Sequence, residues 1–368
     1  MTSRSVPVGR PSRSLQGLLR REALLALLLV AAGAVNAGLS PYFLNARNLM
    51  DMTFNFMERS LIALPMAFII ISGNIDLSVA SNLAMSAAIM GVLFRAGWNV
   101  WLAALGGLLT GAVGGLLNGF LVARAKLPAL VVTLGTYALY RGVAFVLLGD
   151  QAITQLPAGF TYIGQGYLPG TYISVPLVLF AIAAVVYGLV LHYTAFGRWL
   201  YAIGSNEEAC RYSGVPVDRI KVILFGLSGL MSALAGLVLA ARISSIRPNI
   251  ATGFELEVIT AVVLGGVDIM GGQGTLPGVV LALFLIGVAR YGMSLKNVPG
   301  QTQSTLIGVL LIASILLPQL LRRLARAPDA GRMATGSERM LRAAQEEMPV
   351  AQVGSVDTAS QSLDERRR

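Results

Sequence analysis

Residues 194–216 read TAFGRWLYAIGSNEEACRYSGVP, a polar segment between two strongly apolar halves of the chain. Ser205 precedes Glu208 by three residues, which is the spacing of a capping box at the start of a helix. Gly214 can take the left-handed conformation that ends a helix, and Pro216 prevents its continuation. The two turns between these signals are too short to be stable alone in water. We therefore expect a short helix that is held by its flanks or docked on a partner, and docking is the working hypothesis.

The composition around this segment indicates the class of protein. Of the 368 residues, 55% are hydrophobic and only 12% are charged, and the mean hydropathy is +0.70. A water-soluble core cannot bury that much apolar surface. The apolar runs have roughly the 17–25 residues of a membrane helix, not the alternating ten-residue segments of a barrel. The sequence predicts an all-α integral membrane protein.

Ten apolar runs predict a polytopic bundle of about ten transmembrane helices. They lie at residues 23–39, 59–73, 77–94, 99–122, 128–148, 173–192, 220–241, 256–271, 275–293 and 303–321. Arginines within residues 1–22 precede the first run and place the N-terminus in the cytoplasm. This basic start could belong to a signal peptide, but the run is long and lacks a clear small-residue cleavage pattern. We interpret it as a retained first span.

The charges of the loops agree with an even number of spans. Arg322 and Arg323 place the far end of the apolar region in the cytoplasm, whereas residues 150–172 contain no Lys or Arg and are expected outside. The predicted organisation is a basic cytoplasmic segment, a membrane domain with a cytoplasmic loop, and a disordered cytoplasmic tail. These parts cover residues 1–22, 23–321 with the loop at 193–219, and 322–368. Cytoplasmic arginines explain most of the net charge of +10, so no nucleic-acid partner is needed.

Small residues recur every fourth position in two of the predicted spans. The two sets are Gly107, Gly111, Gly115 and Gly119, and Ser228, Ser232, Gly236 and Ala240. Such ridges let helix backbones approach closely. They predict tight packing within one bundle, and a helix that slides during a conformational cycle is the alternative.

Two glycine-containing segments interrupt hydrophobic stretches. They are SGNIDLS at residues 72–78 and GGVDIMGGQG at residues 265–274, each with an aspartate behind glycine. Broken helices at corresponding places in two halves of a transporter often mark the substrate site or a gate. The candidate pathway residues here are Asn74, Asp76, Asp268 and Gln273. In the alternative interpretation both segments are short turns in which Asp76 and Asp268 cap the helices that follow.

Further charged residues lie in or beside predicted spans. Arg141 lies inside the fifth span, one turn after Tyr137, and either faces a wet cavity or extends towards an interface. We count both residues as pathway candidates. Glu255 and Glu257 begin the eighth span and could pair with Arg242 or Arg247 or meet an external partner, although a solvated rim is the favoured interpretation.

Several kinds of chemistry have no motif in the sequence. It contains no G-x-x-x-x-G-K-[ST] phosphate loop and therefore no evident means of holding ATP. One cysteine, Cys210, excludes an intrachain disulfide, and one histidine, His192, leaves no His-based triad or zinc site. No nucleophile–base–acid constellation can be assembled. We expect no cofactor, no metal and no catalytic residue.

Several motifs in combination resemble the permease subunits of ATP-binding-cassette (ABC) importers. Residues 208–214, EACRYSG, are similar to the E-A-A-x-x-x-G motif of the cytoplasmic coupling helix, with Cys210 at the third position. Residues 72–79 (SGNIDLSV) and 261–275 (AVVLGGVDIMGGQGT) resemble the branch that imports monosaccharides. Asn74 stands where glycine is usual, and Asp268 where a smaller or amide residue often occurs. The resemblance covers roughly residues 40–320.

Two further segments favour particular members of this branch. Residues 292–303 (GMSLKNVPGQTQ) and 147–151 (LLGDQ) look most like the rhamnose and autoinducer-2 permeases. Rhamnose is the favoured substrate, although no residue chemistry separates one neutral polyol from another.

The resemblance implies a set of partners and a location. Such importers work in the bacterial inner membrane with two permeases, identical or homologous, a separate cassette ATPase that hydrolyses ATP, and a periplasmic sugar-binding protein. Membrane lipid and a small sugar complete the expected partners. The coupling helix implies a set of residues that meet the ATPase, with Gly204 as a pivot: Ser205, Glu207, Glu208, Ala209, Arg211 and Gly214.

Two other classes of protein are open alternatives. An ion-coupled secondary transporter would need buried carboxylates that titrate. A membrane-embedded enzyme would need a reactive cluster. The even number of spans, the missing phosphate loop and the capped helix favour the permease.

Overall fold

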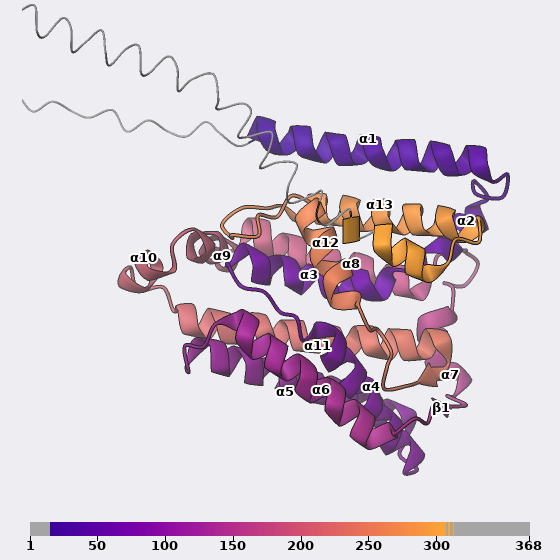
Figure 1. Cartoon of the computed structure of the whole chain (residues 1–368), viewed down its shortest axis with the longest axis horizontal. Helices are drawn as coiled ribbons and strands as arrows, with labels where there is room; N and C mark the ends of the chain where they lie inside the picture. The colour runs from indigo at the N-terminus through magenta and orange to yellow at the C-terminus, as the bar shows by residue number, and fades with distance from the viewer. Residues whose placement is uncertain (1–14, 307, 310–311, 313–368) are drawn as a thin grey trace, which may run out of the picture. The chain divides into compact units, whose positions relative to one another are not determined.

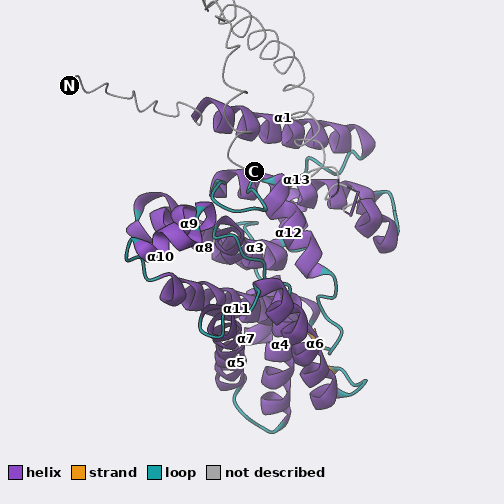
Figure 2. Cartoon of the chain, turned by 60° about the vertical axis from the view of Figure 1, so that its left-hand side comes forward, coloured by secondary structure: helices purple, strands orange, loops and turns teal. Residues whose placement is uncertain are grey.

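The computed structural model describes residues 15–306, 308–309 and 312, with side chains from residue 22 onward. The predicted tail, the arginines after the last apolar run and most of the predicted span at 303–321 lie outside the described residues. Helices form nearly all of the regular structure in the described part of the chain (Figures 1 and 2).

The elements follow one another with short connections. They are α1 (Leu15–Leu39), α2 (Ala46–Thr53), α3 (Met57–Ile71), α4 (Val79–Arg95), α5 (Val100–Ala123), α6 (Ala129–Leu148), β1 (Ile153–Thr154), α7 (Ala158–Gln165), α8 (Val175–Tyr193), α9 (Ala195–Ser205), α10 (Glu207–Tyr212), α11 (Val217–Ile243), β2 (Ser245–Ile246), α12 (Phe254–Leu264) and α13 (Leu276–Leu295).

The described helices confirm a polytopic membrane protein, while the number of spans stays a prediction. Within the described residues, six helices are long and apolar enough to cross a bilayer, namely α1, α5, α6, α8, α11 and α13. The bent pair α2 and α3, with 54° between its axes, would be a seventh. The predicted spans at 77–94 and 256–271 correspond to the shorter helices α4 and α12.

The predicted span at 256–271 is wrong at its C-terminal end. Helix α12 ends at Leu264 because the chain turns at Gly265 and Gly266, and Gly266 has a φ of 94° that few other residues adopt. The segment is therefore an 11-residue helix followed by a loop. That loop leads to Thr275, which caps α13.

Helix α11 lies at the centre of the bundle and contacts α3, α4, α5 and α7. The predicted glycine ridge packs against it, as expected from the spacing. A Cβ on Gly115 would overlap the carbonyl of Phe225, and one on Gly229 would overlap the carbonyl of Gly111. The α5–α11 contact is thus backbone against backbone, which confirms tight packing.

The outer elements are held by contacts of their own. Helix α1 packs along α13, where the Asn36 amide donates to the Val288 carbonyl at 2.9 Å. At the C-terminal end of α11, β1 and β2 form a two-stranded antiparallel pair, with Ile153 opposite Ile246. Helix α7 lies against the same end, and the Gln165 amide donates to the Arg242 carbonyl at 2.8 Å.

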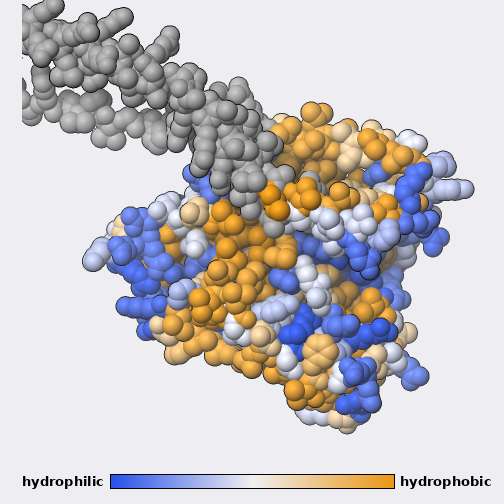
Figure 3. Space-filling view, viewed as in Figure 1, coloured by the Kyte–Doolittle hydropathy of each residue, from blue (hydrophilic) through white to orange (hydrophobic). Residues whose placement is uncertain are grey.

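The surface of the helices is apolar between more polar ends. Figure 3 shows hydrophobic residues over the middle of this face and hydrophilic ones at the end where α9 and α10 lie. Helix α5 exposes Val113 and Phe120, at 64% and 57% of their surface, and α6 exposes Val146 at 87%. A soluble protein rarely exposes so much contiguous apolar surface. This apolar surface is suited to contact with the acyl chains of a lipid bilayer.

Candidate functional site

The polar segment at 194–216 forms two helices that meet at Asn206. This residue is extended, with φ −160° and ψ 99°, and its side chain accepts from the Ala209 N–H at 2.9 Å. Asn206 is therefore the N-cap of α10, and the prediction that Ser205 caps the helix is wrong by one residue. Ser205 ends α9 instead, and its hydroxyl donates to the Tyr201 carbonyl at 2.9 Å. Asparagine caps a helix as well as serine does, so the extended backbone decides between the two.

The predicted end of the helix is confirmed. Gly214 has a φ of 80°, and its N–H donates to the Arg211 carbonyl at 3.1 Å. The next N–H, of Val215, donates to the Cys210 carbonyl at 3.0 Å. This pair of bonds is a Schellman motif, which satisfies the last carbonyls of a short helix.

An ion-pair network ties α10 to the first turns of α11. The Glu207 carboxylate accepts from Arg211 at 2.9 Å, four residues on, and from Lys221 at 2.7 Å. Arg211 also pairs with Asp218 at 2.6 Å. Burial acts to raise the pKa of Glu207, but the hydrogen bonds and charges of Lys221 and Arg211 outweigh it and hold this pKa below its ordinary value. Glu207 and Arg211 are thus bonded within the chain.

The opposite face of α10 is exposed. Glu208 and Ala209 are exposed, and Tyr212 exposes 93% of its surface. Cys210 is buried, on the face of α10 that packs against the rest of the chain. The contact of Ser205, Glu207, Glu208, Ala209, Arg211 and Gly214 with an ATPase stays a prediction.

The two broken-helix segments meet each other beside the end of α9. The Gly272 N–H donates to the Ile71 carbonyl at 2.8 Å, and a Cβ on Gly204 would overlap both of these groups. Gly73 lies directly against Gly271. We call this contact, formed by residues 71–73, Gly204 and residues 271–272, the glycine junction. Sequence reasoning identified the three segments separately but not their contact, which only the fold creates.

A tyrosine adds a second link between α9 and the second broken segment. The Tyr201 hydroxyl donates to the Gly274 carbonyl at 2.7 Å. Together with the glycine junction, this bond fixes α9 to the loop between α12 and α13. Helix α9 is therefore in contact with both broken segments.

Asp76 lies in the interior of the bundle. One carboxylate oxygen accepts from the Ser78 N–H at 2.9 Å and the Ser78 hydroxyl at 2.6 Å, and the other accepts from the Ser228 hydroxyl of α11 at 2.8 Å. Asn118 of α5 donates to the Ser78 hydroxyl at 2.8 Å. Asp76 is not the cap of α4, because Ser78 occupies the N-cap position. Its hydrogen bonds join the first broken segment to α11.

Asn74 and the second broken segment have different surroundings. The buried Asn74 amide bonds within its own turn, to the Ser72 carbonyl at 3.1 Å. Asp268 is half-buried and accepts from the Met270 N–H at 3.0 Å in a tight turn, and Gln273 is exposed. Asp268 does not cap α13, because Thr275 does. Asp76 and Asp268 occupy corresponding places in the sequence but unlike environments.

Arg141 clamps the loop between α11 and α12. Its guanidinium donates to the carbonyls of Pro248 and Ile250 at 2.7 and 2.9 Å, and to that of Ala80 at 3.3 Å. The side chain is half-buried, as is that of Tyr137. Backbone carbonyls thus satisfy the guanidinium, an arrangement that neither sequence interpretation anticipated. The role of both residues in a pathway stays a prediction.

Two ion-pair clusters that sequence reasoning missed lie at the starts of α3 and α12. Glu257 pairs with Arg59 at 2.6 Å and with Arg290 at 2.6 Å, and Glu58 pairs with Arg242 at 2.5 Å. The predicted partners of Glu257 and the solvated rim are both wrong, since its side chain is only 13% exposed. The sequence did contain a signal for these clusters: charged residues stand at the starts of apolar runs, and a charge next to a membrane span needs a partner of opposite sign.

Taken together, the fold and the site define a polytopic helical membrane protein with a short helical segment that is anchored to the bundle on one face and exposed on the other. Residues 48–315 match the family described as "Branched-chain amino acid transport system / permease component". The match covers well over half of the chain, and the chain belongs to this family.

Known relatives agree with this assignment. The chain is 38% identical over 281 residues to the ribose import permease protein RbsC of Bacillus subtilis, covering 76% of this chain and 87% of the relative. It is 37% identical over 300 residues to the autoinducer 2 import system permease protein LsrD of Escherichia coli K12, covering 80% and 89%. The corresponding Klebsiella pneumoniae protein is 36% identical over 301 residues, covering 80% and 90%. No solved structure matches the chain.

These matches confirm the resemblance to import permeases of the ribose and autoinducer-2 type. The chain is accordingly a transport subunit rather than an enzyme, and a multi-pass protein of the inner membrane.

Proposed function

We propose that the chain forms the translocation pathway of an ATP-driven importer for a monosaccharide. The import permeases to which it is similar are named for ribose and for autoinducer 2. Rhamnose is the favoured substrate, on the strength of residues 292–303 and 147–151, and autoinducer 2 is the alternative. Both substrates are small neutral polyols, so the same kind of pathway would serve either.

The observation that carries the proposal is the double attachment of the polar segment at 194–216. Helix α10 is tied to α11 through Glu207, and α9 is tied to both broken segments through the glycine junction. A force on the exposed face of α10 would therefore reach the membrane helices through bonds already in place. A helix with one anchored and one free face suits that purpose.

The proposed mechanism is alternating access driven by a separate cassette ATPase. Closure of the ATPase on ATP would move α10, and the bundle would convert this motion into opening of a path between two permeases, identical or homologous. A periplasmic binding protein would deliver the sugar. The path itself needs only a weak site, because tight binding would slow release.

Residue roles follow from this mechanism. Glu208 and Ala209 would contact the ATPase directly, while Glu207 and Arg211 would position α10 for that contact. Ser205 and Gly214 would lie at the two ends of the contact. The proposed pathway residues are Asn74, Asp76, Tyr137, Arg141, Asp268 and Gln273.

The experiment that tests the proposal is purification of the chain from its native membrane in mild detergent, with identification of every stoichiometric partner. We expect a cassette ATPase and either a second copy or a homologous permease. The binding protein encoded nearby would then be tested against rhamnose and autoinducer 2. Recovery of this chain alone across several detergents would contradict the proposal.

Charge reversal at Glu208 tests the coupling contact. Because Glu208 is exposed on the free face of α10, Glu208→Arg should abolish sugar-stimulated ATP hydrolysis by the reconstituted complex while membrane insertion is kept. The matched control is Asp150→Arg, an equal charge reversal on an exposed residue of the predicted outer loop. Normal stimulation in Glu208→Arg would rule out the contact.

An ion-coupled secondary carrier is the second candidate, and the surroundings of Asp76 favour it. Among the described residues, only hydroxyl and backbone groups hydrogen-bond to this buried carboxylate, and no Lys or Arg forms an ion pair with it. A buried carboxylate without a cation can bind a proton. Uptake that stops with a protonophore but continues after ATP depletion would favour the carrier.

A further inference from the structure

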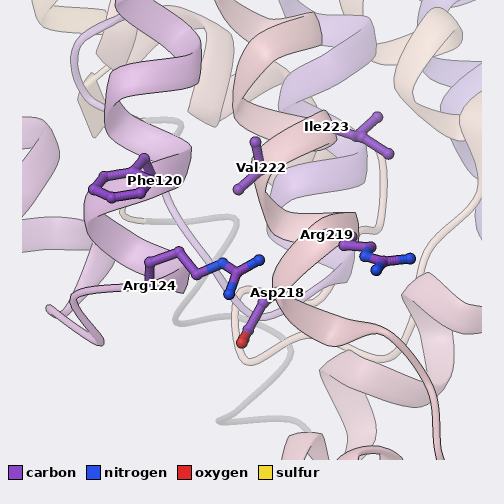
Figure 4. Close-up of a pocket in the computed structure, with 6 residues that line it drawn as sticks. All are labelled: Phe120, Arg124, Asp218, Arg219, Val222 and Ile223. Atoms are coloured by element: carbon purple, nitrogen blue, oxygen red, sulfur yellow. The ribbon is translucent and has the colours of Figure 1, made fainter.

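A groove of about 710 Å³ lies between the last turn of α5 and the first turns of α11. Its lining residues are Phe120, Arg124, Asp218, Arg219, Val222 and Ile223 (Figure 4). Arg124 reaches from α5 towards the first turn of α11, where Asp218 lies, and Arg219 extends from that same turn on the other side of α11, away from Arg124. Of these residues, Asp218 takes part in the ion-pair network that anchors α10.

The groove has an apolar half and a cationic half, arranged alike on both helices. On α5, Phe120 precedes Arg124 by four residues, and on the antiparallel α11, Arg219 precedes Ile223 by four. Four residues are about one helical turn, or roughly 6 Å along the axis. On each helix, an exposed apolar side chain therefore lies one turn farther from the predicted cytoplasmic end than the arginine does. Phe120 and Ile223 expose 57% and 48% of their surface.

The groove keeps an excess of positive charge despite Asp218. That carboxylate is paired with Arg211 of α10 at 2.6 Å, so its charge is already compensated. Among the described residues, neither Arg124 nor Arg219 forms an ion pair of its own. Both arginines are exposed and lie at the predicted cytoplasmic ends of their helices.

We propose that this groove binds an anionic phospholipid, with its headgroup across the first turn of α11, between Arg124 on one side and Arg219 on the other, and an acyl chain along Phe120, Val222 and Ile223. Basic pockets between membrane helices on the cytoplasmic side suit anionic headgroups, and the deeper apolar side chains suit acyl chains. A soluble anion would gain nothing from the apolar half. A second copy of the chain would have to bring its own anion to the two arginines.

The bound lipid would lie next to the anchor of α10. Asp218 lines the groove and also holds Arg211, so the phosphate at the arginines would lie near the carboxylate that anchors α10. Anionic lipid is therefore positioned to influence how firmly α10 is held.

Native mass spectrometry of the purified full chain tests the proposal. The wild-type chain, offered equal amounts of phosphatidylglycerol and phosphatidylcholine, should retain phosphatidylglycerol preferentially. Each arginine near a membrane surface contributes about 1 kcal/mol of attraction, so Arg124→Gln and Arg219→Gln should each lower retention about fivefold. Arg124→Lys and Arg219→Lys keep the charge and should retain the lipid. Arg198→Gln, the same charge loss on an exposed residue of α9, is the matched control.

Three results would overturn the proposal. The first is equal retention of the two lipids by the wild-type chain, a measurement that needs no variant. The second is displacement of phosphatidylglycerol by millimolar inorganic phosphate, which would indicate a soluble anion as the ligand. The third is disulfide cross-linking between two copies carrying Arg219→Cys in a Cys210→Ser background, which would show that a second chain covers the groove.

Discussion

Gly204 is the residue at which α9 meets both broken segments. A Cβ here would overlap backbone atoms, the Ile71 carbonyl and the Gly272 N–H, which cannot rotate away as a side chain could. Gly204→Ala should therefore destabilise the fold by about 1–3 kcal/mol, the usual cost of overpacking, and separate α9 from the junction. Thermal unfolding in detergent measures the loss.

A matched glycine provides the control for this substitution. Gly135 lies in the exposed face of α6, where an added Cβ would meet nothing within 4 Å. Gly135→Ala should leave the unfolding temperature unchanged or raise it slightly, since alanine is the better helix former. Equal effects of the two substitutions would mean that the junction is not packed as described.

Asp76 permits a test that separates structure from ion coupling. Asp76→Asn keeps an oxygen for Ser78, and its amide can donate to the Ser228 hydroxyl, so the fold should persist. Asp76→Leu should cost about 1–3 kcal/mol for each buried polar group left without a partner. If the chain serves an ATP-driven importer, uptake by Asp76→Asn should stay close to wild type. Loss of uptake with normal folding, together with inhibition of wild-type uptake by a protonophore, would support an ion-coupled carrier instead.

At the scale of the element, α10 is held by charge, and its attachment should depend on pH. The pKa of Glu207 in the folded chain is lowered, so its ion pairs contribute stability above the unfolded pKa of roughly 4.3, and this contribution is lost as pH falls through the folded value. With its side chain 35% exposed, each pair is worth about 0.2–1 kcal/mol. We expect the protection of the residue 207–212 amides against hydrogen exchange, relative to the intrinsic rate at each pH, to be high at pH 7 and to fall once the pH drops below the lowered pKa of Glu207.

Glu207→Gln supplies the comparison for this pH dependence. The variant lacks the charge at every pH, so it should exchange faster than wild type at pH 7 and equally fast once wild-type Glu207 is protonated. A difference between the two that persists at low pH would exclude the Glu207 carboxylate as the cause.

The same element shows what the sequence could and could not predict. The Gly214 stop was predictable, because glycine readily takes the left-handed conformation that ends a helix and Pro216 prevents its continuation. The start was missed by one residue, because Ser205 and Asn206 both suit a cap and the choice depends on where α9 ends. The glycine junction was beyond prediction, since it joins residues about 70 to 200 positions apart. Local chemistry thus fixes helix ends, whereas contacts between loops depend on the whole bundle.

At the scale of the whole molecule, α3 is joined at one end to α12 and at the other to the loop between α12 and α13. Glu257 of α12 pairs with Arg59 near the start of α3, and Gly272 of the loop bonds to Ile71 at the end of α3. Glu257 also pairs with Arg290 of α13. These three helices should therefore move together in a transport cycle, because separating them would break ion pairs at one end and the glycine junction at the other.

Two glutamates in this chain each bridge two cations, and their comparison tests the importance of burial. Glu257 lies within the bundle with 13% of its side chain exposed, while Glu207 lies on the surface with 35% exposed. Glu257→Gln would remove the carboxylate that pairs with both Arg59 and Arg290, and removing one partner of a buried pair typically costs about 3–5 kcal/mol. Glu207→Gln should cost about 0.2–1 kcal/mol per pair, because water can replace the carboxylate.

Chemical unfolding in detergent measures both costs, and the free energy of unfolding should fall more in Glu257→Gln than in Glu207→Gln. At high salt the loss in Glu207→Gln should become smaller still, while the loss in Glu257→Gln persists. A Glu257→Gln variant as stable as Glu207→Gln would show that water reaches the cluster, and α3, α12 and α13 would then be free to separate at that end.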